Sequence, residues 1–136
     1  GELDMSYRHS SITEEHYMVL GVTIALEAGS QEQIRAKMEE LKEKRVEKQP
    51  LEYPSAGSTF KRPEGYFAGK LIMDAGLRGF QVGGAAVSEK HCGFVINKEK
   101  ATASDVYRLI QEVQQEVYRQ FGVKLETEVK MVGDFT

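Results

Sequence analysis

Alternating apolar residues predict a β-strand over residues 17–27. The alternating positions carry Met18, Leu20, Val22, Ile24 and Leu26. A period of two places these five side chains on one face of an extended chain.

A helix is predicted next, from Ser30 to about residue 46. Ser30 suits the N-cap, and Gln33 three residues on completes a capping box. The apolar positions of this helix are Ile34, Met38 and Leu41. Charged residues occupy its other faces.

Two prolines mark the end of this strand–helix unit. Pro50 and Pro54 follow the helix closely, and proline and the residue before it disfavour helical backbone. The sequence therefore predicts a boundary here, with residues 1–50 on one side and residues 54–136 on the other.

The second part of the chain interleaves helices with strands. In chain order, the pattern predicts a loop over 54–63, a helix over 66–75, strands within 79–87 and 93–97, a helix from Thr102 to Gly122 and a strand over 124–132. The helix after Thr102 is the clearest, with an apolar face made by Val106, Leu109, Ile110, Val113 and Val117. Short connections between such elements indicate an α+β fold.

Composition excludes several kinds of partner. The 136 residues carry a formal charge of −3, whereas general nucleic-acid binding rewards a basic excess. No apolar run is long enough to span a membrane. The single cysteine, Cys92, cannot form an internal disulfide, so we expect a reducing cytoplasm.

The bare residues show little catalytic chemistry. The three histidines and one cysteine lack metal-ligand spacing, so we expect no metal site. The glycines fit neither a phosphate-binding P-loop nor a dinucleotide fingerprint. His91 and Cys92 are adjacent, and neighbours on an extended chain point to opposite faces. A structural thiol is therefore favoured over a Cys–His nucleophile pair.

The predicted loop before Pro63 has two interpretations. Its small residues, the hydroxyls of Ser55 and Ser58, and the charges of Lys61 and Arg62 suit contact with a ligand. The same residues suit a polar turn between domains whose serines cap the next helix. The residues alone favour the turn.

Other candidate residues also have two interpretations, and the residues alone favour an ordinary solvated surface for them. Arg45 and Lys48 lie i and i+3 at a helix end, where they could bind a phosphate or complement the helix dipole. Arg8, His91 and Glu128 are of types that are more often solvated surface residues than ligands.

Five motifs, taken in their order along the chain, give these candidate residues one common interpretation. They are Tyr7-Arg8-His9-Ser10, the loop from Ser55 to Pro63, Ala75-Gly-Leu-Arg-Gly79, Gly83-Gly-Ala-Ala-Val-Ser88 and Leu125-Glu-Thr-Glu-Val-Lys130. From about Ser6 to Gly133 the chain resembles the UDP-N-acetylenolpyruvoylglucosamine reductase family, and specifically its C-terminal part.

The resemblance implies a chemistry and roles for three residues. In the family, NADPH reduces FAD, and the flavin gives hydride to the enolpyruvyl double bond, forming UDP-N-acetylmuramate for peptidoglycan. Ser58 corresponds to the proton donor and Arg8 to the arginine that binds the enolpyruvyl carboxylate. Glu128 corresponds to the glutamate that completes this site. A fixed cation and a positioned hydroxyl suit a transition state that builds negative charge.

The resemblance also implies substrate-binding residues. Arg45 and Lys48 correspond to residues near the UDP moiety. Arg62 replaces a common asparagine, His91 stands where some relatives use glutamine, and Tyr7 is expected to line the pocket. The short connection from Glu27 to Ser30 resembles the family class that lacks an inserted tyrosine loop.

The resemblance implies that a flavin-binding region lies outside this chain. Residues 1–50 would then be the remnant of the second flavin-binding lobe, and residues 54–136 the substrate-binding domain. We expect the chain to bind neither FAD nor NADPH by itself and to be inactive alone. The strand at 17–27 would have an exposed edge, which predicts self-association or disorder of residues 1–12 with Arg8 displaced. The alternative function is a freestanding module that binds a sugar nucleotide or another anion.

Overall fold

The computed structural model describes residues 3–135, apart from the side chain of Thr13. The chain divides into two compact units, Gly1–Arg35 and Ala36–Thr136. Each unit is described by itself below.

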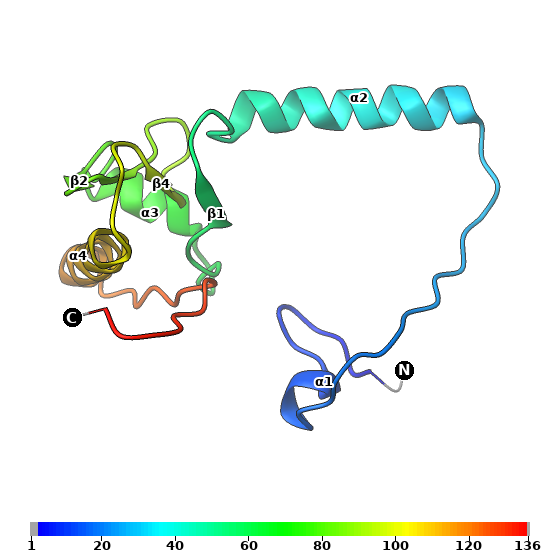
Figure 1. The fold of residues 1–136 in the computed structure, drawn as a ribbon, viewed down its shortest axis with the longest axis horizontal. Coiled ribbons are helices and arrows are strands. Elements are labelled where there is room, and N and C mark those ends of the chain that lie inside the picture. The colour runs from blue at the N-terminus through cyan, green and yellow to red at the C-terminus, as the bar shows by residue number, and fades with distance from the viewer. Residues whose placement is uncertain (1–2, 136) are drawn as a thin grey trace. The chain divides into compact units, whose positions relative to one another are not determined.

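The first unit holds little regular structure. A tight turn pairs Ser6 with His9, and helix α1 spans Ser11–Glu14. Residues 17–27 form no strand, so this sequence prediction is wrong (Figure 1). The physical reason is that a strand needs a neighbouring strand to hydrogen-bond its backbone. Within the described residues this segment joins no β-ladder, and the hydrogen bond from the Tyr17 amide to the Ile12 carbonyl belongs to the turn after α1.

Helix α2 spans Gln31–Lys48 and confirms the second prediction. The amide of Gln33 lies 3.5 Å from the Ser30 hydroxyl oxygen, at the limit of a capping hydrogen bond. None of the α2 residues is buried. The helix therefore depends on its own backbone hydrogen bonds and on surface ion pairs rather than on packing.

The second unit is built on a four-stranded antiparallel sheet in the order β1-β4-β3-β2. Its strands are β1 (Ser55–Ser58), β2 (Gln81–Val82), β3 (Ala85–Val87) and β4 (Phe94–Asn97). Helices α3 (Ala68–Asp74) and α4 (Ala103–Phe121) complete the unit (Figure 1). The predicted α+β class is confirmed.

Both ends of α4 follow from local sequence signals. The Thr102 hydroxyl accepts a hydrogen bond from the Asp105 amide, and the Asp105 carboxylate accepts one from the Thr102 amide. Gly122 ends the helix with φ = 67°, a conformation that glycine adopts without strain. Four of the five predicted apolar positions are buried, namely Leu109, Ile110, Val113 and Val117.

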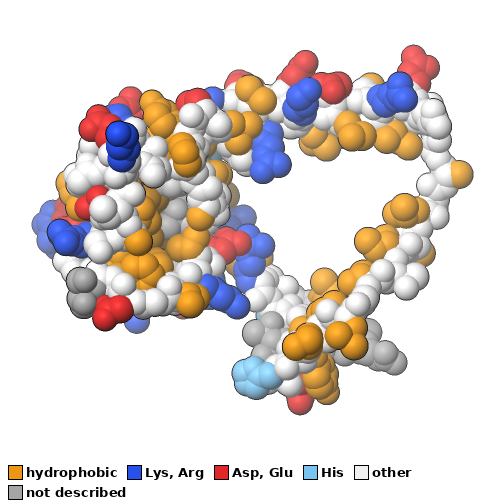
Figure 2. Space-filling view, viewed as in Figure 1, with side chains coloured by type: hydrophobic (Ala, Val, Ile, Leu, Met, Phe, Trp, Pro, Cys, Tyr) orange, Lys and Arg blue, Asp and Glu red, His pale blue; other side chains and the backbone are white. Residues whose placement is uncertain are grey.

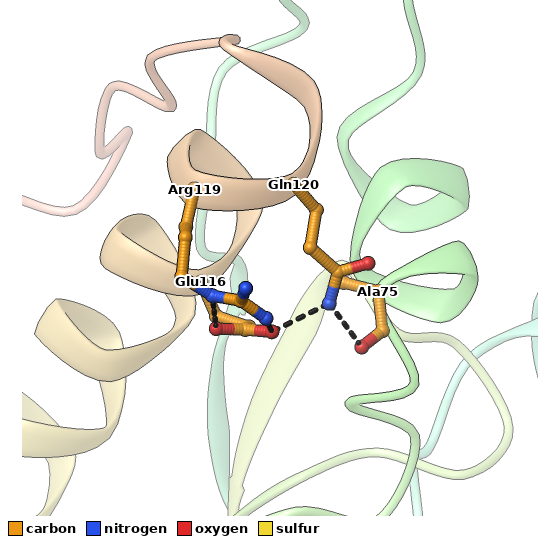
Figure 3. A network of polar contacts seen from close by, with 4 residues as sticks. All are labelled: Ala75, Glu116, Arg119 and Gln120. Carbon is orange, nitrogen blue, oxygen red and sulfur yellow. Dashed lines mark hydrogen bonds and ion pairs between the residues drawn. The ribbon is translucent and has the colours of Figure 1, made fainter.

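A polar network ties the end of α4 to the end of α3 (Figure 3). The Gln120 side chain donates to the Ala75 carbonyl at 3.1 Å and also to Glu116. Two guanidinium nitrogens of Arg119 donate to Glu116 at 2.8 and 2.6 Å. Together these donors lower the pKa of Glu116 from 4.5 to about 2.

The core lies between the helices and one face of the sheet. It includes Ala85 and Val87 of β3, Val95 of β4, Ile72 of α3 and the buried face of α4. Alternate residues of a strand point to opposite faces, so Ala86, Phe94 and Ile96 lie on the other side of the sheet. We call that side the open face, because neither α3 nor α4 covers it, although Ala86, Phe94 and Ile96 are themselves buried.

Two further sequence predictions are wrong. Residues 55–58 form β1 rather than loop, because their backbone pairs with β4. Residues 124–132 form one isolated bridge, Phe60 with Thr127, rather than a full strand. The apolar side of this segment still faces inward where it can, since Leu125 is buried and Val129 packs against the core.

Candidate functional site

Ser58 ends β1 on the open face. Its Cα partner across the sheet is Phe94, and paired residues of neighbouring strands share a face. The side chain is exposed, and its hydroxyl donates only a long hydrogen bond, 3.4 Å, to the Phe60 carbonyl. The hydroxyl is therefore accessible to a ligand.

The bridge between Phe60 and Thr127 brings the backbone of Glu128 opposite Thr59, the residue that follows Ser58. The Glu128 amide donates to the Thr59 carbonyl at 2.9 Å, and the Lys61 amide donates to the Glu126 carbonyl at 2.8 Å. Glu128 is thus bound through its backbone to the residue that follows Ser58. The backbones of two of the three predicted catalytic residues are therefore close together, and their roles stay predictions.

Thr59 connects this pair to the middle of the sheet. Its amide donates to the Gly93 carbonyl at 2.8 Å, and its hydroxyl oxygen accepts from the Val95 amide at 3.0 Å. The side chain is only 3% exposed. Sequence reasoning missed this residue, since nothing in the sequence marks one threonine as a junction of three hydrogen bonds.

His91 stands close to the same junction. Its Nδ1 accepts a hydrogen bond from the Gly93 amide at 3.1 Å, so a neutral ring carries its proton on Nε2. The ring also meets Phe94 edge to face, with centroids 5.0 Å apart. His91 is exposed and could offer Nε2 to a ligand.

The two cations of the 55–63 segment already have protein partners. Lys61 forms an ion pair with Glu126 at 3.1 Å. The guanidinium carbon of Arg62 lies 4.0 Å from the centre of the Phe67 ring, a cation–π contact that orients the group. The serines do not cap the next helix, whose N-cap is Phe67, so that part of the alternative interpretation is wrong.

Arg45 and Lys48 are exposed in the last turn of α2. Arg45 donates to the Gln49 side chain at 3.1 Å. Lys90, from the loop before β4, donates to the Val46 carbonyl at 2.8 Å. This bond joins the last turns of α2 to the loop that precedes β4.

Tyr7 and Arg8 belong to the first unit. Arg8 has φ = +57° in the turn closed by two backbone hydrogen bonds between Ser6 and His9. Its guanidinium carbon lies 5.6 Å from the centre of the Tyr7 ring. The location of Arg8 beside Ser58 and Glu128 stays a prediction.

Cys92 is a structural thiol, as the sequence predicted. It belongs to the core cluster and is 7% exposed. Burial raises the pKa of the thiol above its ordinary value, which lowers the fraction of reactive thiolate.

A cavity of about 570 Å³ lies between β1, α4 and the C-terminal segment. Its lining is mostly apolar, and neither Ser58 nor Glu128 contributes to it. Ser58, which is exposed, and Glu128, which is half-buried, therefore lie outside this cavity.

The glycine pair before β3 does not fit a flavin phosphate. A side chain at Gly84 would overlap the Glu99 carbonyl oxygen, and one at Gly83 would overlap the Asp105 carboxylate. The space is filled by the chain itself, and the carboxylate would repel an anion. Among the described residues, no cluster of three histidine, cysteine or acidic side chains could hold a metal ion. None of the helices within residues 3–135 is long and apolar enough to cross a membrane.

The fold and site define a class, namely an α+β domain that presents polar groups on the open face of a helix-backed sheet. Residues 49–132 match the family model described as the C-terminal domain of UDP-N-acetylenolpyruvoylglucosamine reductase. The chain therefore belongs to that family.

Relatives extend the match over nearly the whole chain. The UDP-N-acetylenolpyruvoylglucosamine reductase of Agathobacter rectalis is 66% identical over 134 residues, which cover 98% of this chain and 43% of that protein. A Clostridium botulinum relative of the same name is 57% identical over 133 residues, covering 98% and 44%. The chain thus spans less than half the length of these relatives.

A solved structure agrees with the fold. The crystal structure of UDP-N-acetylenolpyruvylglucosamine reductase from Thermus caldophilus matches with a TM-score of 0.73 and 34% identity. The match covers 95% of this chain and 45% of that chain.

Proposed function

We propose that this chain supplies the substrate side of an NADPH- and FAD-dependent reductase that converts UDP-N-acetylglucosamine enolpyruvate to UDP-N-acetylmuramate. The observation that carries the proposal is the backbone hydrogen bond between Glu128 and Thr59, which holds the backbone of Glu128 next to the residue that follows the exposed Ser58. Family membership supplies the reaction.

The proposed task of Ser58 is to protonate the substrate. When hydride has been added to the enolpyruvyl double bond, the carbon next to the carboxylate carries an electron pair. The Ser58 hydroxyl transfers its proton to that carbon. Its weak hydrogen bond to the Phe60 carbonyl leaves the proton available.

The proposed tasks of Arg8 and Glu128 concern charge and orientation. Arg8 pairs with the substrate carboxylate and stabilises the charge that spreads onto it. Glu128 completes the proton-transfer site from the neighbouring segment.

The remaining candidates would bind the rest of the substrate. Arg45 and Lys48 present two cations from one helix turn, which suits a diphosphate. Arg62, held on Phe67, and His91, held on Gly93, are oriented donors at the edge of the site. Tyr7 would line the pocket beside Arg8.

None of these residues is proposed to take part in hydride transfer. FAD and NADPH are proposed as cofactors of the whole enzyme, bound by a region that the chain does not supply, and the isolated chain is proposed to be inactive. The proposed setting is peptidoglycan synthesis in the cytoplasm.

The experiment is a Ser58→Ala substitution in a chimera in which this chain replaces the matching 134 residues of the Agathobacter rectalis relative. We expect NADPH to bleach the flavin normally, whereas the enolpyruvyl substrate should no longer reoxidise it. Ser104→Ala in α4 is the matched control and should reoxidise normally. Normal reoxidation by Ser58→Ala would contradict the proposal.

The second candidate function is an anion-binding module, favoured by the exposed Arg45 and Lys48. Calorimetry of the chain alone with a UDP-sugar distinguishes the two functions. Binding tighter than about 1 mM, about 4 kcal/mol, that is lost in Arg45→Ala would favour an autonomous site. Weaker binding would favour a substrate site completed by other parts of the enzyme.

A further inference from the structure

We propose that a β-bulge at Gly57 is the device that positions Ser58 for proton transfer. The inference rests on the proposed function, because it assigns a task to Gly57 only through Ser58. Gly57 is thus a positioning residue, because it acts on the substrate only through Ser58.

The register of β1 against β4 contains one extra residue. Ser55 pairs with Ile96 and Ser58 pairs with Phe94. Three steps along β1 therefore match two steps along β4, which is the count of a β-bulge. The extra residue lies between Ser55 and Ser58.

The bulge decides which face Ser58 occupies. Residues three apart in a regular strand point to opposite faces. With the bulge, Ser55 and Ser58 both pair with residues of the open face, Ile96 and Phe94. Without it, the strand that starts at Ser55 would turn Ser58 toward the helices.

Thr59 shows what the alternative register would lose. In the observed register Thr59 points inward, where its hydroxyl accepts from the Val95 amide. A slip by one residue exchanges the faces of all later side chains. It would bring Thr59 out and bury Ser58.

The bulge has a backbone requirement that glycine meets. Gly57 has φ = +88°, and a Cβ built at this position meets no atom within 4 Å. There is therefore room for a side chain, and the constraint is conformational rather than steric. Residues other than glycine disfavour this φ, with asparagine the best tolerated.

The first test uses the chimeric reductase and measures both its steady-state kinetics and the single-turnover reoxidation of its flavin. We expect Gly57→Ala to lower kcat about 100-fold, the cost of misplacing a reacting group by about 1 Å, with KM little changed. Gly57→Asn should recover most of the activity. Gly76→Ala is the matched control, since Gly76 has φ = +79° and equal space but lies at the end of α3, and it should keep wild-type kcat.

The second test asks whether Gly57 acts through Ser58. Because the Ser58→Ala chimera is expected not to turn over, its affinity for the enolpyruvyl substrate is measured instead. Adding Gly57→Ala to it should cause no further loss of affinity, because the group that Gly57 positions is already absent. A further loss would mean that Gly57 serves another part of the site, and the proposal would be overturned.

A shortened strand provides the third test and remains valid if Gly57→Ala fails to fold. Deleting Ala56 removes the extra residue and lets Ser55 and Ser58 keep their partners in a regular strand. In that background Gly57→Ala should be harmless to kcat. A loss as large as in the full-length strand would contradict the bulge.

The outcomes separate this inference from the proposed function. If Ser58→Ala reoxidises normally, the proton-donor assignment is wrong and Gly57 has nothing to position. If Ser58→Ala fails to reoxidise but Gly57→Ala does so at the wild-type rate, the proposed function stands and the inference alone is wrong.

Discussion

Two regions of this chain carry equally regular apolar patterns, but one forms a buried helix face and the other stays exposed and without regular structure. Helix α4 repeats apolar residues at helical spacing and buries them, with Leu109 0% exposed. Residues 17–27 alternate apolar residues and expose them, with Leu20 92% exposed (Figure 2). A regular pattern fixes which side chains share a face, whereas a partner surface decides whether the element forms.

Backbone hydrogen bonding shows the same difference. Strand β4 has only four residues but pairs on both sides, with β1 and β3. The longer segment at 17–27 forms no ladder with the described residues. Helix α4 needs no neighbour for its backbone, because a helix satisfies most of its own amides.

The largest expected effect comes from truncating one leucine in each region. Leu109→Ala leaves a cavity in a packed core and should lower the free energy of unfolding by about 2–5 kcal/mol. Leu20→Ala is the matched change and should alter it by less than about 0.5 kcal/mol. Urea unfolding of the chain followed by circular dichroism measures both. Equal losses would show that Leu20 is packed in solution and would break the comparison.

The next largest effect is expected from comparing Thr59, which follows β1 in the sheet, with a threonine of the 17–27 segment. Thr59→Val removes the acceptor of the buried Val95 amide and should cost about 1–3 kcal/mol. Thr23→Val changes an exposed residue of the 17–27 segment and should cost almost nothing. The same unfolding experiment applies, and hydrogen exchange at the Val95 amide should accelerate only in Thr59→Val. An unchanged exchange rate would mean that the hydroxyl does not hold β1 to β4.

The sequence predicts α4 well because all its signals are local. The cap at Thr102, the apolar spacing and the glycine at 122 are each read within a few residues, and the structure confirms them. The strand predicted at 17–27 is wrong because its backbone partners cannot be read from its own residues. The strand predicted at 124–132 fails similarly, pairing only through Thr127.

The candidate site is predictable only in part for the same reason. Ordered motifs and a family resemblance single out Ser58 and Glu128, and the structure pairs their backbones through Thr59. The bulge at Gly57 and the three hydrogen bonds of Thr59 depend on register, which no single motif encodes. Arg8 lies in the other unit, so its task stays a prediction.

Self-association would test the exposed segment directly. Apolar side chains and unpaired backbone groups together make a segment that can pair with another chain, so we propose that isolated copies associate through residues 17–27. Leu20→Glu should weaken association by about tenfold, or about 1.4 kcal/mol, in sedimentation velocity experiments. Val132→Glu, a similarly exposed position, is the control and should change nothing. A monomer at all concentrations would contradict this proposal.

The smallest expected effect is a difference in pH dependence between the two units. In the second unit, Arg119 and Gln120 lower the pKa of Glu116 to about 2. A lowered folded-state pKa contributes stability above the unfolded value, here 4.5, and that contribution is lost as pH falls from about 4.5 toward about 2. In the first unit, the hydrogen bond from His9 to Glu14 raises the pKa of His9 above 6.5. That contribution is present below about pH 6.5 and is lost as pH rises through the raised value.

The two contributions should therefore disappear at opposite ends of the pH range. Thermal unfolding between about pH 5 and about pH 2 should show a smaller acid-dependent fall in Tm for Glu116→Gln than for the unaltered chain, and the control Glu112→Gln should behave as the unaltered chain.

An NMR titration of the His9 ring should report the raised pKa, and Glu14→Gln should return it toward 6.5. Both groups are on the surface, where salt screens such pairs, so added salt should reduce both effects. A salt-independent effect at Glu116 would instead mean that its network with Ala75 is buried in solution, and the two units would then differ in their ion pairs as much as in their packing.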